Sequence, residues 1–435
     1  MKVIDKVKIE GFWTDKTIEL KLREDVNFLI GVNGSGKTTI INLIAATLKA
    51  DFFTLDRFQF KKIKIDLKKQ KIDNKTKNAF IEVEKVEKEA SPFSYIKFKI
   101  KDYNDEKPKV FNLDKLEAER LIHYSSEYLS PKRYTRGGIF ERDVNLALQE
   151  LVNVTWLSIN RTTSYIPYTN KRREERGVES TIDQKIEELQ RELERYFSLL
   201  DRKSSAETDI FQKYIFESLI DAAEHGNTLD FSKGLNAEVE KESLKQIFLH
   251  LGLDKNVTNK KLDTHFQGYT DSLNKYNKKF GMSIKDFSFL IDTRRIHTVV
   301  QKWNSLIKKQ DEINESKNIF LHVINNLLQR KKLFINEKND LEVKTESGKI
   351  FSLINLSSGE KQLLIILGQS LLQESKTHIY IADEPELSLH VEWQEKIVSS
   401  LQKVNPNSQI LFATHSPDIV GEFASSVIKV EEVIS

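Results

Sequence analysis

The stretch Gly31–Thr39, which reads GVNGSGKTT, constrains the fold of this chain more than any other part of the sequence. It fits the phosphate-loop pattern G-x-x-x-x-G-K-[ST], with Gly31 and Gly36 at the two glycine positions. Glycines without a Cβ let successive backbone N–H groups turn toward one anion, and the N-terminal end of a following helix adds positive potential. Residues 26–30 are an apolar run that predicts a buried strand, and residues 39–48 predict a helix. Because strand and helix flank the loop, we favour a phosphate site over a glycine-rich turn that matches by accident.

The side chains of this loop have separate predicted tasks. Lys37 would reach the β- and γ-phosphates of a nucleotide, and the Thr38 hydroxyl would hold Mg²⁺. We therefore expect ATP and Mg²⁺ as cofactors. The predicted nucleotide-binding residues of the loop are Asn33, Gly34, Ser35, Gly36, Lys37, Thr38 and Thr39.

Length and composition limit the other classes of function. The 435 residues suggest two or three domains. The absence of cysteine excludes disulfides and thiolate metal sites, and the nine histidines are scattered. No apolar run approaches the roughly 18 residues that cross a bilayer, and the N-terminus alternates charged and apolar residues, so we expect a cytoplasmic protein without membrane contact. The net charge is +3, from 68 basic and 65 acidic residues, so any contact with DNA would need local patches.

The N-terminal part predicts an antiparallel layer of strands. Trp13, beside the first turn, is either an aromatic side chain that closes a hairpin, which we favour, or a platform for adenine. The lysine cluster of Lys61–Lys77 is either a solvated face, which we favour, or a nucleic-acid contact. The runs with strand-like alternation are residues 2–10, 16–22, 58–66, 78–84 and 94–102.

The middle of the chain predicts a helical insertion. Residues 141–152 predict a helix, and residues 154–159 predict a buried strand that ends at Asn160-Arg161. From about residue 178 to 332 the pattern is amphipathic and helical, and its stripe would pack on its own neighbours or bind a partner helix. The stripe consists of Ile182, Ile186, Leu189, Leu193, Tyr196 and Leu200.

Three further motifs follow near the C-terminus, after a predicted hairpin at 341–345 and 350–354. LSSGEKQ begins at Leu356, and its Ser357 and Glu360 have the offset of a capping box. IYIADEPE predicts a strand that delivers Asp383, a Mg²⁺ ligand, and Glu384, which would orient the attacking water. ATHSP ends another predicted strand with His415, which we interpret as a sensor of the γ-phosphate.

The ordered set GVNGSGKTT, LSSGEKQ, IYIADEPE and ATHSP resembles the head of an ABC-class ATPase. The chain resembles the SMC/Rad50/RecF branch in its N-terminal hairpin, its insertion and its sequence DEPELSLH. Within that branch it resembles the compact bacterial ATPases of phage defence. The resemblance implies an α/β P-loop head with a mixed sheet, flanking helices and an antiparallel layer. Its lobes would be residues 1–177 and 333–435, with residues 178–332 as the helical insertion.

The resemblance also implies a head-to-head dimer with ATP between the subunits. Ser357 and Gly359 would then contact the nucleotide of the partner copy. The signature reads LSSGE where transporters have LSGGQ, and His390 stands where many heads have an aspartate. No clear Q-loop glutamine is present, and Arg161 is assigned to the nucleotide or to the partner subunit.

Three functions remain open at this stage. In the first, the chain would be an ATPase sensor of an anti-phage pair, similar to AriA of PARIS or PtuA of Septu. In the second, it would be a RecF-like or Rad50-like repair ATPase that closes on DNA. In the third, it would be an orphan transporter ATPase. The short insertion and balanced charge favour the first. Its expected partners are a second copy of the chain, an effector nuclease or toxin in trans, and a phage-encoded trigger. We expect no nuclease within this chain, and assembly beyond a dimer stays open.

Overall fold

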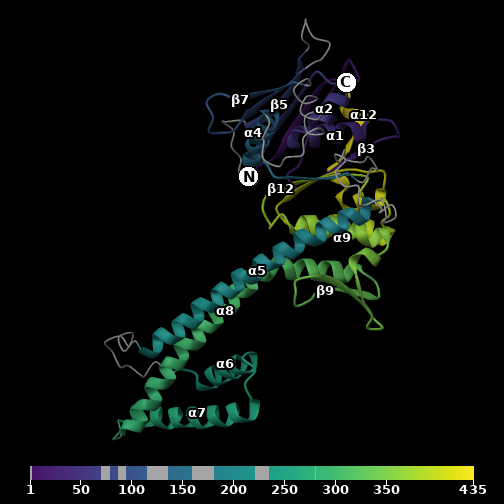
Figure 1. Cartoon of the computed structure of the whole chain (residues 1–435). Coiled ribbons are helices and arrows are strands. Elements are labelled where there is room, and N and C mark those ends of the chain that lie inside the picture. Colours follow the sequence, from purple (N-terminus) through teal and green to yellow (C-terminus); the bar gives the residue numbers. More distant parts are fainter. Residues whose placement is uncertain are drawn as a thin grey trace. The chain divides into compact units, whose positions relative to one another are not determined.

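The computed structural model divides the chain into two compact units (Figure 1). Unit 1 consists of Met1–Arg195 and Ser316–Ser435, and unit 2 consists of Tyr196–Glu315. The domain borders at 178 and 332 remain predictions. The structure describes residues 2–69, 79–86, 95–114, 136–158, 181–220, 235–279 and 281–435.

An antiparallel sheet forms the N-terminal layer of unit 1. Among the described residues it has six strands in the order β2-β1-β4-β5-β6-β7. Apolar side chains alternate with lysine and glutamate, because one face packs on the core and the other faces solvent. The strands are β1 (Lys2–Phe12), β2 (Lys16–Lys21), β4 (Lys62–Lys69), β5 (Ala79–Val86), β6 (Tyr95–Lys101) and β7 (Lys109–Asp114).

The predicted strand at 58–66 begins later than expected. The preceding helix α2 (Phe52–Arg57), which we did not predict, is capped by the Asp51 side chain, and Phe58 is its C-cap. The chain therefore joins the ladder only at Lys62, opposite Glu10. Strand β7 was also missed.

A parallel sheet lies at the centre of unit 1. Its described strands run in the order β14-β3-β13-β12-β8. The inner strands are continuous apolar runs, which is typical of parallel strands covered on both faces. The strands are β3 (Val26–Ile30), β8 (Val154–Ser158), β12 (His378–Asp383), β13 (Ser408–Ala413) and β14 (Val427–Lys429). Four were predicted. Among the described strands β8 lies at the sheet edge, and three of its side chains are half-buried where we expected burial.

Helix α1 (Lys37–Lys49) joins the cores of the two sheets. Its apolar residues belong to one hydrophobic cluster that contains side chains of β1, β4, β12 and β13. The Ile40, Ile41 and Ile44 side chains have 0% exposure. A helix buried around most of its circumference is held rigidly, so its first turn is fixed relative to both sheets.

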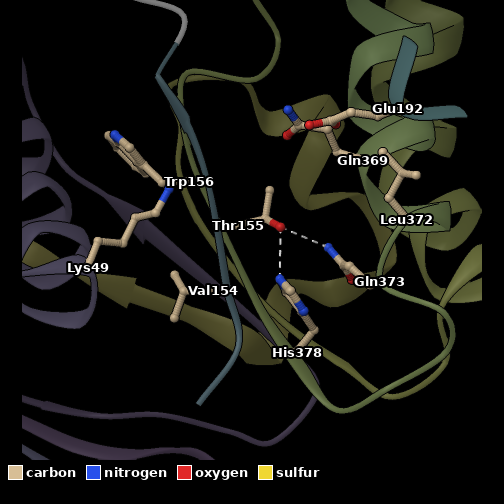
Figure 2. A pocket seen from close by; sticks show the side chains of 9 residues that line it. All are labelled: Lys49, Val154, Thr155, Trp156, Glu192, Gln369, Leu372, Gln373 and His378. Carbon is tan, nitrogen blue, oxygen red and sulfur yellow. Dashed lines mark hydrogen bonds between the residues drawn. The ribbon is translucent and has the colours of Figure 1, made fainter. Parts of the chain in front are cut away.

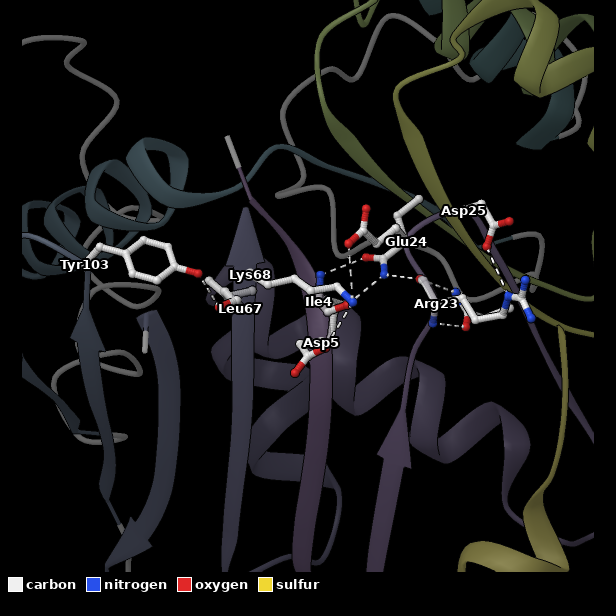
Figure 3. Close-up of polar contacts among 10 residues, drawn as sticks. Ile4, Asp5, Arg23, Glu24, Asp25, Leu67, Lys68 and Tyr103 are labelled. Carbon is white, nitrogen blue, oxygen red and sulfur yellow. Dashed lines mark hydrogen bonds and ion pairs between the residues drawn. The ribbon is translucent and has the colours of Figure 1, made fainter. Parts of the chain in front are cut away.

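A buried glutamine also ties the sheets together, through contacts with Ile4 and Arg23, which Figure 3 labels. Gln409 on β13 accepts a hydrogen bond from Ile4 N at 2.8 Å and donates to Ile4 O at 2.7 Å and to Arg23 O at 2.6 Å. On the same side, Lys68 forms ion pairs with Asp5 at 3.1 Å and with Glu24 at 3.5 Å. The Gln409 bonds link β13 to the N-terminal strand β1, and the Lys68 ion pairs link β4 to β1 and to the segment before β3.

The C-terminal part of unit 1 adds a small sheet and two helices. The predicted hairpin is present as β10 (Leu341–Thr345) and β11 (Ile350–Ser352), and β9 (Lys331–Ile335), which we did not predict, pairs with β10. Helix α9 (Ser358–Leu371) contacts α10 (Val391–Val404). Helix α9 also packs closely on the start of α5. A Cβ atom added at Gly368 would lie only 2.9 Å from the Leu189 side chain.

Unit 2 is helical. Helices α5 (Thr181–Ile220) and α8 (Ile284–Leu327) each have one end in unit 1 and continue in unit 2. They lie side by side (Figure 1), and the Lys309–Glu207 ion pair at 2.7 Å joins them. Helices α6 (Ala237–His250) and α7 (Lys255–Asn277) are capped by Asn236 and Asp254. The apolar core of this unit is Leu244, Ile247, Leu262, Phe266, Tyr269, Leu290, Val300, Trp303 and Leu306.

The predicted stripe of α5 is largely confirmed. Ile186, Leu189, Leu193 and Leu200 are buried, whereas Ile182 and Tyr196 are half-buried and Phe197 has 0% exposure. The 3.6-residue period of the helix places Phe197, one position later, on the buried face. No helix in the described ranges has the length and hydropathy that crossing a membrane requires.

Candidate functional site

The phosphate loop connects β3 to α1 at the carboxyl end of the parallel sheet. Gly34 and Gly36 have φ angles of 82° and 96°, which residues with a Cβ rarely adopt. A Cβ at Gly36 would also lie 3.0 Å from the Phe12 ring and 3.1 Å from the Trp13 ring. Glycine is therefore required at position 36 both for the turn and for the close approach of the β1–β2 hairpin.

Lys37, the first residue of α1, is held inside the loop. It is 6% exposed, and its Nζ donates hydrogen bonds to the carbonyl oxygens of Gly31 at 2.7 Å and Val32 at 3.1 Å. Burial lowers the pKa of Lys37, while nearby carboxylates, Glu431 first, oppose that shift. The ammonium group is thus confined at the point where the sequence predicts phosphate.

The remaining loop residues differ in exposure. Asn33 and Gly34 are exposed, and Ser35 and Thr39 are half-buried. The Ser35 hydroxyl oxygen is buried without a hydrogen-bond partner among the described residues. A buried hydroxyl without a partner is free to donate to an anion, which suits its predicted role.

Strand β12 brings Asp383 to the start of α1. The Thr38 hydroxyl donates a hydrogen bond to Asp383 Oδ1 at 3.2 Å, although the two residues are 345 positions apart. Burial, with smaller contributions from Glu384 and Glu386, raises the pKa of Asp383 to about 6. The two predicted metal ligands therefore meet in this structure, and they form a set of oxygen donors.

Glu384 and His415 lie beside each other at the ends of β12 and β13. Their side-chain atoms Oε1 and Nε2 are 4.0 Å apart, and both side chains are partly exposed. Glu384 has a φ of 49°, and its N–H donates to Ala413 O at 2.8 Å. The left-handed backbone turns its side chain away from the strand direction, and the bond to Ala413 fixes that turn.

Glu386 supports this pair. Its Oε1 accepts hydrogen bonds from the Thr414 hydroxyl and from His415 N, each at 2.8 Å. The other carboxylate oxygen is buried and has no partner within the described residues. Glu386 therefore holds the segment that carries His415. No role was predicted for Glu386 from the sequence, although IADEPE places three acidic residues close together.

The predicted signature motif LSSGEKQ forms the capped N-terminal end of helix α9. Ser357 Oγ and Ser357 N both donate to Glu360 Oε2 at 2.9 Å, and Glu360 N donates back to Ser357 Oγ at 3.4 Å. Lys331 Nζ also donates to Glu360 Oε1 at 2.8 Å. The capping box is thus present, and the exposed Ser357 hydroxyl is engaged in it.

Gly359 has a packing reason of its own. A Cβ at this position would lie 2.4 Å from Ser388 O, closer than real contacts allow. Glycine therefore lets α9 approach the segment that follows the two carboxylates. Within the described part of one chain, no hydrogen bond or ion pair joins Ser357 or Gly359 to the phosphate loop. Arg161 lies outside the described residues.

Two residues join the candidate site through the tertiary structure. Trp13, which stacks on Phe12 with a centroid distance of 4.6 Å, is 43% exposed and lies next to Gly36. Glu431, near the C-terminus, accepts a hydrogen bond from Val32 N at 2.7 Å. Trp13 was noticeable in the sequence as an aromatic residue beside the first predicted turn. No local sequence pattern marks Glu431 as a residue of the site.

A separate pocket of about 240 Å³ lies at the amino ends of β8 and β12 (Figure 2). Thr155 Oγ1 lies 2.8 Å from His378 Nε2 and accepts a hydrogen bond from Gln373 at 3.2 Å. Burial, followed by the Lys49 charge, lowers the pKa of His378 to about 4. The other residues that line the pocket are Lys49, Val154, Trp156, Glu192, Gln369 and Leu372. The predicted chemistry is at the opposite, carboxyl ends of these strands.

Comparisons with known proteins agree with this architecture. The model of the AAA_15 family, described as AAA ATPase domain, matches residues 1–420. The retron Vc95 probable ATPase of Vibrio cholerae serotype O1 biovar El Tor is 34% identical over 136 residues, which cover 29% of this chain and 26% of that protein. The retron Ec83 probable ATPase of Escherichia coli is 34% identical over 113 residues, covering 23% of this chain and 19% of that protein.

One solved structure is similar over most of its length. The Smc head domain with an extended coiled coil from Pyrococcus furiosus, bound to the C-terminal domain of ScpA, has a TM-score of 0.40 and 13% identity. The similarity covers 97% of this chain and 91% of that chain.

Proposed function

Since the chain belongs to the AAA_15 family of AAA ATPase domains, we propose that it binds ATP with Mg²⁺ at the phosphate loop and hydrolyses it between two copies of the chain. We further propose that this cycle holds or releases an effector protein in anti-phage defence. The observation that carries the first proposal is the hydrogen bond from Thr38 to Asp383. It joins the start of the loop helix to the carboxylate pair, as Mg²⁺-dependent phosphoryl transfer requires.

The donor set at this point fits Mg²⁺. This ion takes oxygen ligands and is usually held by one or two carboxylates together with substrate phosphates. Thr38 and Asp383 supply a hydroxyl and a carboxylate. In the described ranges no group of three His, Cys, Asp or Glu residues is arranged to hold a metal alone, which agrees with a site completed by phosphate oxygens. When bound, Mg²⁺ would neutralise negative charge that develops on those oxygens.

The protein side chains then have distinct tasks. Lys37 would exchange its carbonyl partners for phosphate oxygens, and the Ser35 hydroxyl would donate to the same anion. Glu384 would accept the proton of the attacking water, because its side chain lies partly exposed at the strand end. His415, 4.0 Å from Glu384, would contact the γ-phosphate. Trp13 closes the hairpin by stacking on Phe12, and its exposed part beside Gly36 would also stack on the adenine ring.

Helix α9 would complete the site of a second copy. The N-terminal end of a helix favours an anion, and α9 presents an exposed serine there. In that complex the Ser357 hydroxyl would turn from Glu360 to the partner's nucleotide. The Glu360 carboxylate would keep its bonds to Ser357 N and to Lys331.

Mixing two defective variants tests the shared site. Lys37→Ala removes the loop's cation, and Ser357→Arg blocks the helix end, so each homodimer should be inactive. A mixture should recover hydrolysis because a heterodimer has one intact composite site. Phosphate release is the measurement, and unmixed variants at the same total concentration are the control. A mixture that is no more active than either variant would contradict the shared site.

The proposed defence role draws on the motifs and on unit 2. Two relatives are named as retron ATPases, and the motifs resemble compact phage-defence ATPases. Unit 2 also exposes apolar side chains around the α6–α7 turn, which suit a protein partner. Their exposures are 62% for Leu249, 59% for Leu251, 48% for Leu253 and 55% for Val257.

DNA binding distinguishes this role from a repair ATPase that closes on DNA. We expect Glu384→Gln protein with ATP to bind duplex DNA no more tightly than Lys37→Ala protein does. The measurement is fluorescence anisotropy at two salt concentrations, because non-specific binding falls with salt. An ATP-dependent gain in affinity that persists at the higher salt concentration would favour the repair function.

A further inference from the structure

The C-terminal tail of unit 1 ends beside the phosphate loop. Strand β14 pairs in parallel with β3, so Lys429 lies opposite Ile30, directly before the loop. The short helix α12 (Val430–Val433) follows, and Val430 is fully buried. Beyond it, Ser435 exchanges two backbone hydrogen bonds with Thr17 on β2, at 2.8 and 2.9 Å. The tail is therefore anchored on both sides of Glu431.

This anchoring places the Glu431 carboxylate against the first turn of the loop. Its Oε1 accepts a hydrogen bond from Val32 N at 2.7 Å. A Cβ at Gly31 would lie 2.6 Å from the same oxygen and 2.8 Å from Ser35 Oγ. The first glycine of the loop is thus needed because a carboxylate from the tail occupies the space that a side chain would fill.

The charge of Glu431 also acts on the loop. Among the carboxylates near Lys37, Glu431 has the largest effect on the lysine, ahead of Glu384 and Asp383. Its own backbone N–H and that of Val32 hold the pKa of the Glu431 carboxyl below its usual value, so the group is ionised at neutral pH. The neighbouring Glu432 is used differently, since it pairs with Lys429 at 2.9 Å.

We propose that Glu431 is a positioning residue that clamps the first turn of the phosphate loop from the tail, and that its negative charge weakens the binding of polyphosphate. This inference rests on the proposed nucleotide site. The two effects have opposite signs, because the hydrogen bond to Val32 orders the loop while the charge repels the ligand.

Two substitutions separate the clamp from the charge. Glu431→Gln keeps an acceptor oxygen for Val32 N and removes the charge, whereas Glu431→Ala removes both. The matched control is Glu432→Gln, which removes one charge from the adjacent position. Binding of ATP, ADP and AMP is measured by titration calorimetry at low and high salt, and melting temperatures report folding.

Glu431→Gln should bind ATP about three- to tenfold more tightly than the unchanged chain, as one unit charge at several ångströms in a watery site would produce. The gain should be smaller for ADP, absent for AMP, and reduced by salt. Glu431→Ala should bind ATP more weakly than Glu431→Gln, and Glu432→Gln should match the unchanged chain.

Each other outcome has a defined meaning. ATP affinity of Glu431→Gln equal to or below that of the unchanged chain overturns the charge effect. Equal affinities of the Gln and Ala variants overturn the clamp. A gain in Glu432→Gln equal to that of Glu431→Gln would show a general surface-charge effect and overturn the assignment to Glu431. Failure of the unchanged chain to bind ATP, or binding that survives Lys37→Ala, would instead refute the nucleotide site itself.

Discussion

The two units hold their important side chains in different ways. In unit 1 the candidate catalytic groups lie at the ends of buried parallel strands, where backbone ladders and bonds such as Thr38 to Asp383 fix them. In unit 2 amphipathic helices share a small apolar core and leave large apolar side chains such as Ile284, 91% exposed, at the surface. Chemistry needs positions fixed to a fraction of an ångström, whereas recognition of a partner tolerates an adaptable surface. The difference fits the proposal that unit 1 performs the reaction and that unit 2 contacts a partner protein.

The largest effect should come from Lys37→Ala in unit 1. Removing a buried cation from the loop should weaken ATP binding about a hundredfold or more, since charge-assisted bonds to phosphate are lost. Helix content, measured by circular dichroism, should not change. The control is Lys49→Ala, at the other end of the same helix. Retained ATP binding in Lys37→Ala would show that the nucleotide does not bind at the loop.

Glu384→Gln should separate binding from hydrolysis. We expect turnover to fall about a hundred- to a thousandfold, because a general base is removed. ATP affinity should equal or exceed that of the unchanged chain, since no attractive contact to the nucleotide is lost and one negative charge near the phosphates is removed. Light scattering should show a longer-lived dimer with ATP. The control is Glu395→Gln, an exposed position on α10. Loss of both binding and assembly in Glu384→Gln would contradict the assignment.

Phe266→Ala tests whether unit 2 is independent of the chemistry. Phe266 is 4% exposed within the helical core, so its removal should cost about 3 to 5 kcal/mol of the stability of this unit. Thermal melting by circular dichroism should show an earlier loss of helix, while ATP binding remains. Phe216→Ala, at a position 69% exposed on α5, should change stability by about 0.5 kcal/mol or less. Loss of ATP binding together with unit 2 would show that the two functions are not separable.

The smallest effect should be the dependence of folding stability on pH that the His378 ring causes. Its folded-state pKa of about 4 lies below the ordinary value of 6.5. Between these values the unfolded chain binds the proton more readily, so folding stability falls as the pH falls through this window and is unaffected above it. Because the ring is half-buried, we expect a loss of about 1 kcal/mol from pH 7 to pH 5.5.

His378→Gln should abolish that part of the pH dependence. Urea unfolding at the two pH values, followed by tryptophan fluorescence, is the measurement. His322→Gln, at an exposed position on α8, should keep the slope of the unchanged chain. An unchanged slope in His378→Gln would show that other groups cause the acid sensitivity.

The sequence by itself determined the class of the fold and the order of its motifs. Strands such as Val26–Ile30 and Ser408–Ala413 are apolar runs bounded by turn residues, and the stripe of α5 follows the helical period. These are local patterns, so they were readable without the structure. Elements whose formation depends on a neighbour were missed or misplaced. Strand β9 was missed because it forms by pairing with β10. Strand β8 was correctly predicted, but its burial was overestimated because it lies at the edge of the sheet that the described strands form.

Only the tertiary structure decided which distant residues meet. Thr38 bonds to Asp383 across 345 positions, and Val32 bonds to Glu431 across 399. Strand order sets these pairings, since β14, β3, β13 and β12 are consecutive parallel strands and their carboxyl ends lie at one edge of the sheet. The motif spacing predicted the first meeting, whereas Glu431 has no motif. Its place at the loop follows from a tail that pairs with β3 and β2, and no local pattern in the sequence records such a return of the chain.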